Sequence, residues 1–210
     1  GVEFDTFPSD DEPDDIVPEP DLDRPLEELI GDLGSPDADV RRCAAGADAV
    51  APLIRALARA DDGSRWCIAE ALALIGEDAI PALIAALGND AVQAGAAATL
   101  VRMGKPAVPP LIAALASGDE EVRFGALYAL REIGDVAVPF LVGALEAPDG
   151  ETRRSAATVL NEIGWKPSDD DEAIRYFIAD EAWLDVAEYG GRAVDPLIRI
   201  LRSPDRESWW

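Results

Sequence analysis

The fold is decided by residues Glu121–Leu145, EVRFGALYALREIGDVAVPFLVGAL, which predict two short helices in succession. Apolar residues recur at helical spacing through the first half of this stretch. Gly134 is expected to end the first helix, because glycine adopts the left-handed cap conformation without strain. Pro139 lies near the start of the second helix, where its missing N–H group costs nothing. Two helices of this size cannot bury their apolar faces alone, so the stretch predicts stacked copies of itself.

The same unit recurs along the chain, and its features keep their spacing. A repeated glycine ends each first helix, and a repeated proline opens each second helix about 30 residues from its neighbours. The glycines are Gly76, Gly104, Gly134 and Gly164, and the prolines are Pro81, Pro109 and Pro139. After Gly164 the second helix is delayed until Val194–Leu201, so we expect an insertion in the last unit.

The pattern shared by these units is D-x-x-V-R-x-x-A-x-x-A-L-x-x-I-G-x-x-A-V-P-x-L-I-x-x-L. It resembles HEAT repeats of the short kind named after phycobilisome lyase subunits, and the resemblance covers about Pro25–Leu201. The resemblance implies an all-α protein, an α-solenoid that forms a right-handed superhelix of about five helix pairs. It implies little about chemistry, because HEAT solenoids mostly bind other proteins and only a few act as lyases or hydroxylases.

The chain divides into an acidic, proline-rich tail at residues 1–23 and a solenoid at residues 24–207. The tail holds ten acidic residues and no basic residue, so it cannot bury enough apolar surface to fold alone. Three interpretations of the tail stay open. It is a disordered solubilising segment, it folds back on its own solenoid, or it is a docking segment that presents Phe4 and Phe7 to a partner.

The insertion at residues 165–190, WKPSDDDEAIRYFIADEAWLDVAEYG, predicts two further helices divided near Asp180. It is rich in tryptophan and tyrosine, which are enriched at protein interfaces. One interpretation is extra core packing for a longer terminal unit. The other is an aromatic contact patch made of Trp165, Tyr176, Trp183 and Tyr189.

The composition is strongly acidic, with a formal net charge of −24 from 42 acidic and 18 basic residues. This charge argues against nucleic-acid binding, which needs basic residues to displace counterions from phosphate, and against binding to anionic membrane surfaces. Only Lys105 and Lys166 are lysine, and acid-rich, lysine-poor surfaces are typical of proteins that work in high salt. A halophilic or methanogenic archaeal source would fit this composition, and an acidic protein from a GC-rich genome is the alternative.

The sequence also bears on where the protein acts. No apolar run reaches the roughly 18 residues of a membrane span, and no signal peptide is visible. Cys43 and Cys67 form no close-spaced motif and are expected to be buried, reduced thiols, with a disulfide or a metal site as the alternative. We therefore expect a cytoplasmic protein, although the chain begins with Gly1 and an upstream segment could have been removed.

The motifs of common catalytic chemistry are missing from the sequence. The chain has no histidine, which excludes imidazole proton transfer, Ser–His and Cys–His nucleophiles, and histidine metal sites. It has no glycine-rich phosphate-binding motif. The acidic run Asp169–Glu172 lacks the alternating ligands and central glycine of a calcium loop. We therefore expect a protein that is not an enzyme, with no catalytic residue, no metal and no cofactor.

The outer surface of the stack is the remaining candidate for function. In HEAT solenoids the second helices line the concave face, and the outward positions there are small in the middle units and arginine at the ends. We predict that this face binds a peptide or helix of a protein partner, with the arginines clamping acidic groups. The alternative is that the alanines are small only to permit stacking. The predicted residues are Arg55, Arg59, Ala82, Ala85, Pro110, Ala113, Phe140, Gly143 and Arg199.

These observations favour a non-enzymatic scaffold or adaptor. The alternative, taken from the resemblance, is a bilin lyase-like or chaperone-lyase subunit. Such a lyase would need a pocket for its chromophore and usually a partner subunit, and the sequence indicates no such pocket.

Overall fold

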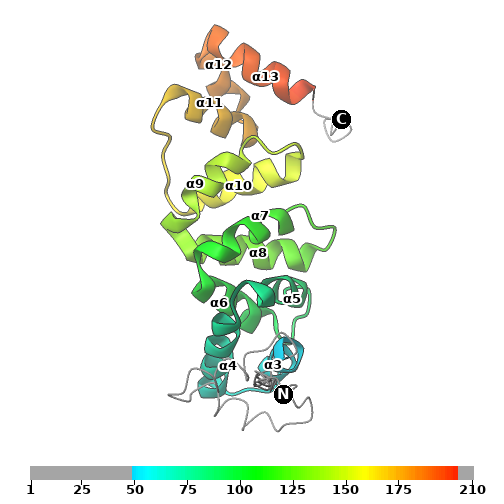
Figure 1. Cartoon of the computed structure of the whole chain (residues 1–210). Helices are drawn as coiled ribbons and strands as arrows, with labels where there is room; N and C mark the ends of the chain where they lie inside the picture. The colour runs from blue at the N-terminus through cyan, green and yellow to red at the C-terminus, as the bar shows by residue number, and fades with distance from the viewer. Residues whose placement is uncertain (1–48, 203–210) are drawn as a thin grey trace, which may run out of the picture.

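A computed structural model of the protein describes residues 49–202, in which α-helices follow one another in an elongated stack (Figure 1). No strand occurs within this range, so the predicted all-α solenoid is confirmed. Short 3-10 turns connect several of the helices. The α-helices are α3 (Val50–Leu57), α4 (Asp62–Ile75), α5 (Ile80–Ala86), α6 (Gln93–Met103), α7 (Val108–Ala114), α8 (Glu120–Ile133), α9 (Val138–Ala144), α10 (Gly150–Glu162), α11 (Asp170–Ala179), α12 (Trp183–Glu188) and α13 (Val194–Leu201).

The junction between α8 and α9 shows how glycine and proline set the repeat. Gly134 has a φ angle of +66°, a backbone conformation that residues other than glycine rarely adopt, and it ends α8. A 3-10 turn at Gly134–Val136 follows, and α9 begins with Pro139 in its first turn. The helix boundaries predicted from this glycine and this proline are therefore confirmed. Equivalent turns join α4 to α5 and α6 to α7.

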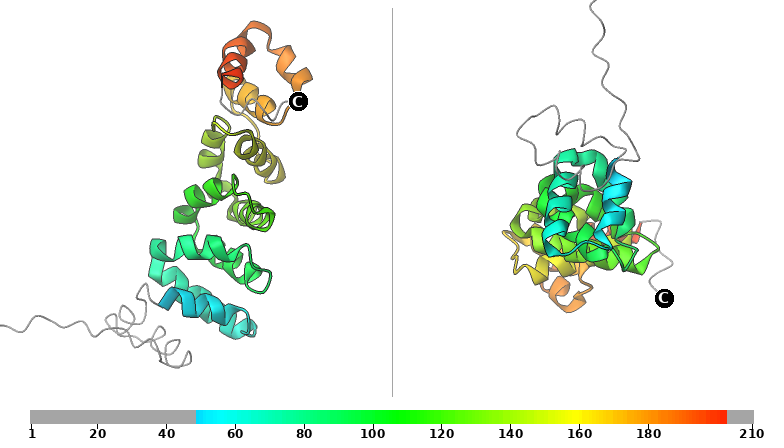
Figure 2. Two further views of the ribbon diagram at one scale, coloured as in Figure 1. Left: turned by 90° about the vertical axis from the view of Figure 1, so that its right-hand side faces the viewer. Right: turned by 90° about the horizontal axis from the view of Figure 1, so that it is seen from below.

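The helices form two columns, which the side view shows (Figure 2). The first helices of the units, α4, α6, α8 and α10, contact one another in order, and so do the second helices α3, α5, α7 and α9. Each second helix also packs closely on the first helix of the following unit, as α7 does on α8 and α9 does on α10. The units therefore share their cores with their neighbours, as the solenoid prediction requires.

The buried core is continuous through the regular units and then divides. One cluster of buried side chains extends from Val50 to Leu160 and also takes in Ala179. A second, small cluster lies at the C-terminal end, where Ile174, Ile178, Val186 and Ala193 pack together with apolar residues of α13. The predicted last helix, α13, is present at Val194–Leu201, but it belongs to this second cluster together with α11 and α12.

Aspartate side chains cap several first helices. Asp61 accepts a hydrogen bond from the Ser64 N–H, and Asp119 accepts from the N–H groups of Glu121 and Val122. The hydrogen bonds from Ser64 lower the pKa of the Asp61 carboxyl. The sequence places an aspartate before each of three first helices, Asp61, Asp90 and Asp119, and so predicts a cap at each. This prediction is wrong for Asp90, because α6 begins at Gln93 after Val92 and has no side-chain cap.

The arginine that recurs near the start of the first helices has a structural role in the turns. Arg123 Nη1 donates to the carbonyl oxygen of Ser117 at 2.7 Å, and Arg153 Nη1 donates to the carbonyl oxygens of Ala147 and Pro148 at 2.7 and 2.9 Å. From the repeat alone, the arginine that recurs at this position would be expected to reach an acidic residue of the neighbouring unit, and this expectation is wrong for Arg123. It satisfies main-chain carbonyls that follow the preceding second helix.

Two glycines allow alternate units to approach each other. A Cβ atom on Gly125 would lie 3.0 to 3.3 Å from side-chain atoms of Leu87, and one on Gly95 would lie 3.1 to 3.3 Å from Leu57. These separations are tighter than ordinary van der Waals contacts. By contrast, a Cβ atom on Gly143 would meet nothing within 4 Å.

We predict that Gly125→Leu destabilises the protein and that the matched Gly143→Leu does not. The leucine at position 125 has to displace Leu87, and overpacking of this kind costs about 1–3 kcal/mol. Gly143 is solvent-exposed inside α9, where replacing glycine is neutral or stabilises by about 0.5–1 kcal/mol. Urea titrations monitored by circular dichroism measure the free energy of unfolding of both variants. Equal stability of the two variants would contradict the packing described here.

We also predict that Asp119→Ala lowers the free energy of unfolding by about 1 kcal/mol, because it removes the N-cap of α8. Asp90→Ala is the control, since Asp90 caps no helix, and it should change stability by less than about 0.5 kcal/mol. Thermal unfolding of the two variants measures the difference. A larger loss in Asp90→Ala than in Asp119→Ala would show that the assignment of caps is wrong.

Candidate functional site

The solvent-facing side of the second helices carries the residues predicted for partner binding. We call this surface, on α3, α5, α7, α9 and α13, the second-helix face. Ala82, Pro110 and Phe140 are half-buried there, and the other predicted residues are exposed. The exposed ones are Arg55, Arg59, Ala85, Ala113, Gly143 and Arg199. Phe4 and Phe7, predicted as a docking segment, lie outside the described residues, as does Cys43.

An open groove of about 640 Å³ lies on the second-helix face and brings two of the predicted residues together. Pro110 of α7 and Phe140 of α9 line it, with Ile80 of α5 and a set of prolines. We call it the proline groove. Its remaining lining residues are Glu77, Pro81, Lys105, Pro106 and Pro109.

The proline groove presents a stiff and mainly apolar surface. Proline has no backbone N–H and fixes its own φ angle, so four prolines leave little main chain free to donate hydrogen bonds. Glu77 and Lys105 are exposed and provide charges of opposite sign at the groove. Such a surface is suited to holding apolar side chains of another chain. Pro81 and Pro109 were predicted only as helix starts, and the local pattern around them did not indicate a groove.

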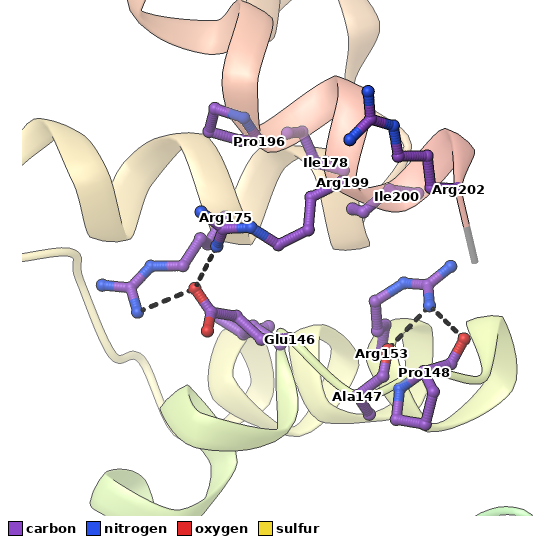
Figure 3. A pocket seen from close by; sticks show the side chains of 11 residues that line it. Glu146, Ala147, Pro148, Arg153, Arg175, Ile178, Pro196, Arg199, Ile200 and Arg202 are labelled. Atoms are coloured by element: carbon purple, nitrogen blue, oxygen red, sulfur yellow. Dashed lines mark hydrogen bonds and ion pairs between the residues drawn. The ribbon is translucent and has the colours of Figure 1, made fainter.

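A second, smaller pocket of about 220 Å³ lies at the C-terminal end of the stack and includes the predicted Arg199 (Figure 3). It is bounded on one side by the turn from α9 to α10 and on the other by α11 and α13. We call it the arginine pocket. Its lining residues are Leu145, Glu146, Ala147, Pro148, Arg153, Arg175, Ile178, Pro196, Arg199, Ile200 and Arg202.

Two arginines of the arginine pocket converge on one carboxylate. Glu146 Oε1 accepts from Arg175 Nη1 at 3.5 Å and from Arg199 Nη1 at 3.3 Å (Figure 3). Arg175 Nε also donates to the carbonyl oxygen of Asp171, which fixes the arginine along α11. At the other end of the pocket, Arg153 points its guanidinium at the carbonyls of Ala147 and Pro148. The arrangement holds four arginines beside a single glutamate.

The position of the arginine pocket follows from the divided core. Leu145 belongs to the main cluster, and Ile178 belongs to the small C-terminal cluster, so the pocket lies where the two clusters meet. Arg199 lies in the last turn of α13 and Arg202 directly follows this helix, and a helix C-terminus favours positive charge. Of the four arginines the sequence pattern indicated only Arg199. Arg153 and Arg175 reach the site from α10 and α11, and Arg202 follows α13.

The predicted aromatic patch is spread over both clusters. Trp165 and Tyr176 are half-buried and pack against the main core. The centroids of their two rings lie 5.8 Å apart. Tyr189 packs beside Phe177 in the small cluster. Burial raises the pKa of Tyr176, and the neighbouring Asp180 carboxylate adds to this shift. These contacts favour the core-packing interpretation for three of the four rings. The aromatic contact patch stays a prediction, and the exposed Trp183 is the ring most accessible to a partner.

A further surface on the first helices was not predicted. Trp66 of α4 and Phe124 of α8 occupy the same position of their units and are 59% and 64% exposed. Arg102 lies over the Trp66 ring, and Arg131 lies over the Tyr128 ring, at 5.4 and 5.2 Å from the ring centroids. A shallow pocket of about 190 Å³ adjoins Phe124. The signal in the sequence that could have indicated this surface is the equivalent position of Trp66 and Phe124, ten residues before Gly76 and Gly134.

The described residues contain no group of three or more His, Cys, Asp or Glu side chains placed to hold a metal ion. Between residues 49 and 202 there is also no helix with the length and apolar character that crossing a membrane requires.

The geometry defines the class of the protein as an α-helical repeat solenoid with an accessible second-helix face. Comparison with known families agrees with this class. Residues 80–161 match the family model for HEAT repeats, and residues 65–89 match that for the PBS lyase HEAT-like repeat. Residues 65–161 therefore carry HEAT repeats, and the first of them match the short, PBS-lyase-like type. No curated protein matches it. HEAT repeats generally mediate protein–protein interaction, which indicates an interaction scaffold.

We predict that the ion pairs of Glu146 contribute little to stability. The Glu146 side chain is 43% exposed and the Arg199 side chain 66% exposed, and pairs this exposed are worth about 0–1 kcal/mol. Glu146→Gln should therefore change the free energy of unfolding by less than about 1 kcal/mol, measured in urea at physiological salt. A loss several times larger would mean that the pair holds the C-terminal helices in place.

Proposed function

We propose that the protein is a non-enzymatic scaffold and that a segment of a protein partner, a peptide or a helix, binds across its second-helix face. The observation that carries the proposal is the proline groove, which is large, open and mainly apolar. Protein segments bind such grooves through apolar side chains, and the rigid walls lower the entropy lost on binding.

Small side chains beside the proline groove support the same proposal. Ala85, Ala113 and Gly143 are exposed at successive second helices, so the backbone of a partner can approach the surface closely. At the C-terminal end of the face, the arginine pocket offers charged donors for an acidic residue of the partner. A partner segment that lies along the column of second helices would contact the apolar proline groove first and then the charged arginine pocket.

The experiment introduces Ala85→Glu and Ala113→Glu together and compares the proteins captured from the source organism by each form of the chain. Two charged side chains on an apolar face should reduce capture of the specific partner at least about tenfold, because their desolvation opposes binding. Ala98→Glu is the matched control, since Ala98 is an exposed alanine on the first helix α6. Quantitative mass spectrometry measures the capture, and circular dichroism checks the fold.

Two outcomes would contradict the proposal. One is unchanged capture by the doubly substituted chain with an intact fold. The other is an equal loss of capture in the Ala98→Glu control, which would move the interface to the first helices or reflect a general effect of added charge.

A second candidate is a bilin lyase-like or chaperone-lyase subunit. The match of residues 65–89 to the PBS lyase HEAT-like repeat is the observation that favours it. If this candidate is right, mixing the protein with a bilin should shift the visible absorbance spectrum of the bilin. An unchanged spectrum, with and without candidate partner subunits, would contradict it.

A further inference from the structure

We propose that the arginine pocket is a carboxylate-binding subsite, and that it takes an acidic side chain of the partner peptide together with an aliphatic neighbour. This inference rests on the proposed function, since it names the chemistry of a segment that lies on the second-helix face.

Glu146 shows what the arginine pocket recognises. One of its two oxygens, Oε1, receives N–H groups from both Arg175 and Arg199. The two guanidinium groups come from different helices, α11 and α13, and converge on this one point (Figure 3). Glu146 therefore acts as an internal ligand, and its oxygen marks the place that a carboxylate of a partner would take.

Arg199 has further donor groups for a ligand. A guanidinium carries five N–H groups, and among the contacts within residues 49–202 Arg199 uses one of its donor nitrogens on Glu146. An incoming carboxylate can therefore pair side by side with Arg199, in the two-bond geometry that makes arginine–carboxylate pairs strong. Because the Glu146 pairs are exposed, exchanging one carboxylate for another costs little.

The local charge of the arginine pocket has the opposite sign to that of the whole chain. Acidic residues outnumber basic ones 42 to 18 in the sequence, yet the pocket holds four arginines and one glutamate. At physiological ionic strength, charges more than about 8 Å apart are largely screened, so the charges that line the pocket act most strongly on a ligand there. This charge is complementary to an acidic segment and unfavourable for a basic one.

The apolar side of the pocket argues for a peptide rather than for a free anion. Ile178, Pro196 and Ile200 line it beside the arginines. Its volume of about 220 Å³ is below the range of about 300–1,000 Å³ that holds whole small molecules. The pocket is thus matched to part of a larger ligand, namely one aliphatic side chain next to one carboxylate.

The experiment selects twelve-residue peptides from a random display library on the full chain, and then measures their binding by fluorescence anisotropy. Selected peptides should carry Asp or Glu beside Leu, Ile or Val. Changing that acidic residue of the peptide to its amide should weaken binding to the unmodified protein about tenfold or more. The chain with Arg175→Gln and Arg199→Gln should bind both peptides within about twofold of each other.

Two further variants sharpen the experiment. Glu146→Gln removes the internal competitor, so it should tighten binding of the acidic peptide several-fold. The chain with Arg102→Gln and Arg131→Gln loses the same charge from the first-helix surface and should keep the tenfold discrimination. Circular dichroism of each variant checks that the helices are intact.

The outcomes separate this inference from the proposed function. If peptides bind but show no acidic preference, or if the Arg175 and Arg199 variant keeps the preference, the carboxylate subsite is overturned and the scaffold stands. The subsite is also overturned if inorganic phosphate competes as well as the acidic peptide at equal concentration, because the pocket would then be a plain anion site. If no peptide binds the unmodified protein, the scaffold proposal and the subsite both fail.

Discussion

The structure depends on the burial of leucine and alanine side chains between helices that are too short to fold alone. An isolated helix of seven or eight residues, such as α5, α7 or α9, is not stable in water. In this chain each of these helices gains its stability from the first helix of the next unit, on which it packs. Fully buried leucines lie at the ends of the second helices. They are Leu57, Leu87, Leu115 and Leu145.

This constraint decides which surfaces are left for function. Because each unit uses its inner sides for its neighbours, the outward sides of the two columns are free of packing requirements. On the second helices the outward side holds small residues and prolines, and on the first helices it holds exposed aromatic rings. Where the repeat is interrupted after α10, the core divides, and the arginine pocket lies at that division. A break in the repeat has thus produced the most distinctive charged site in the described part of the chain.

The sequence was sufficient for the features that a short stretch determines. Gly134 and Pro139 marked the boundaries of α8 and α9, since each acts through its own backbone. Asp90 was assigned wrongly, because the Asn89 side chain turns the chain before α6 by accepting from Ala91 N–H. Helix-start patterns do not distinguish such a turn from a cap.

Features that depend on distant contacts could not be predicted in the same way. Glu146 and Arg199 are 53 residues apart, and only the packing of α11 and α13 brings them together. The division of the core likewise depends on how the residues of the insertion fold, and helical spacing alone did not indicate it. The proline groove combines residues from three units, each of which had a sufficient local explanation.

We propose that the inner sides of the helices hold the stack together while the second-helix face binds the partner. Hydrogen–deuterium exchange of the chain, with and without a captured partner, tests this claim most directly. The account predicts that the partner slows exchange in the second helices α5, α7 and α9 and leaves the first helices α4, α6 and α8 unchanged. Slower exchange confined to the first helices, or no change in any helix of a chain that has bound its partner, would contradict it.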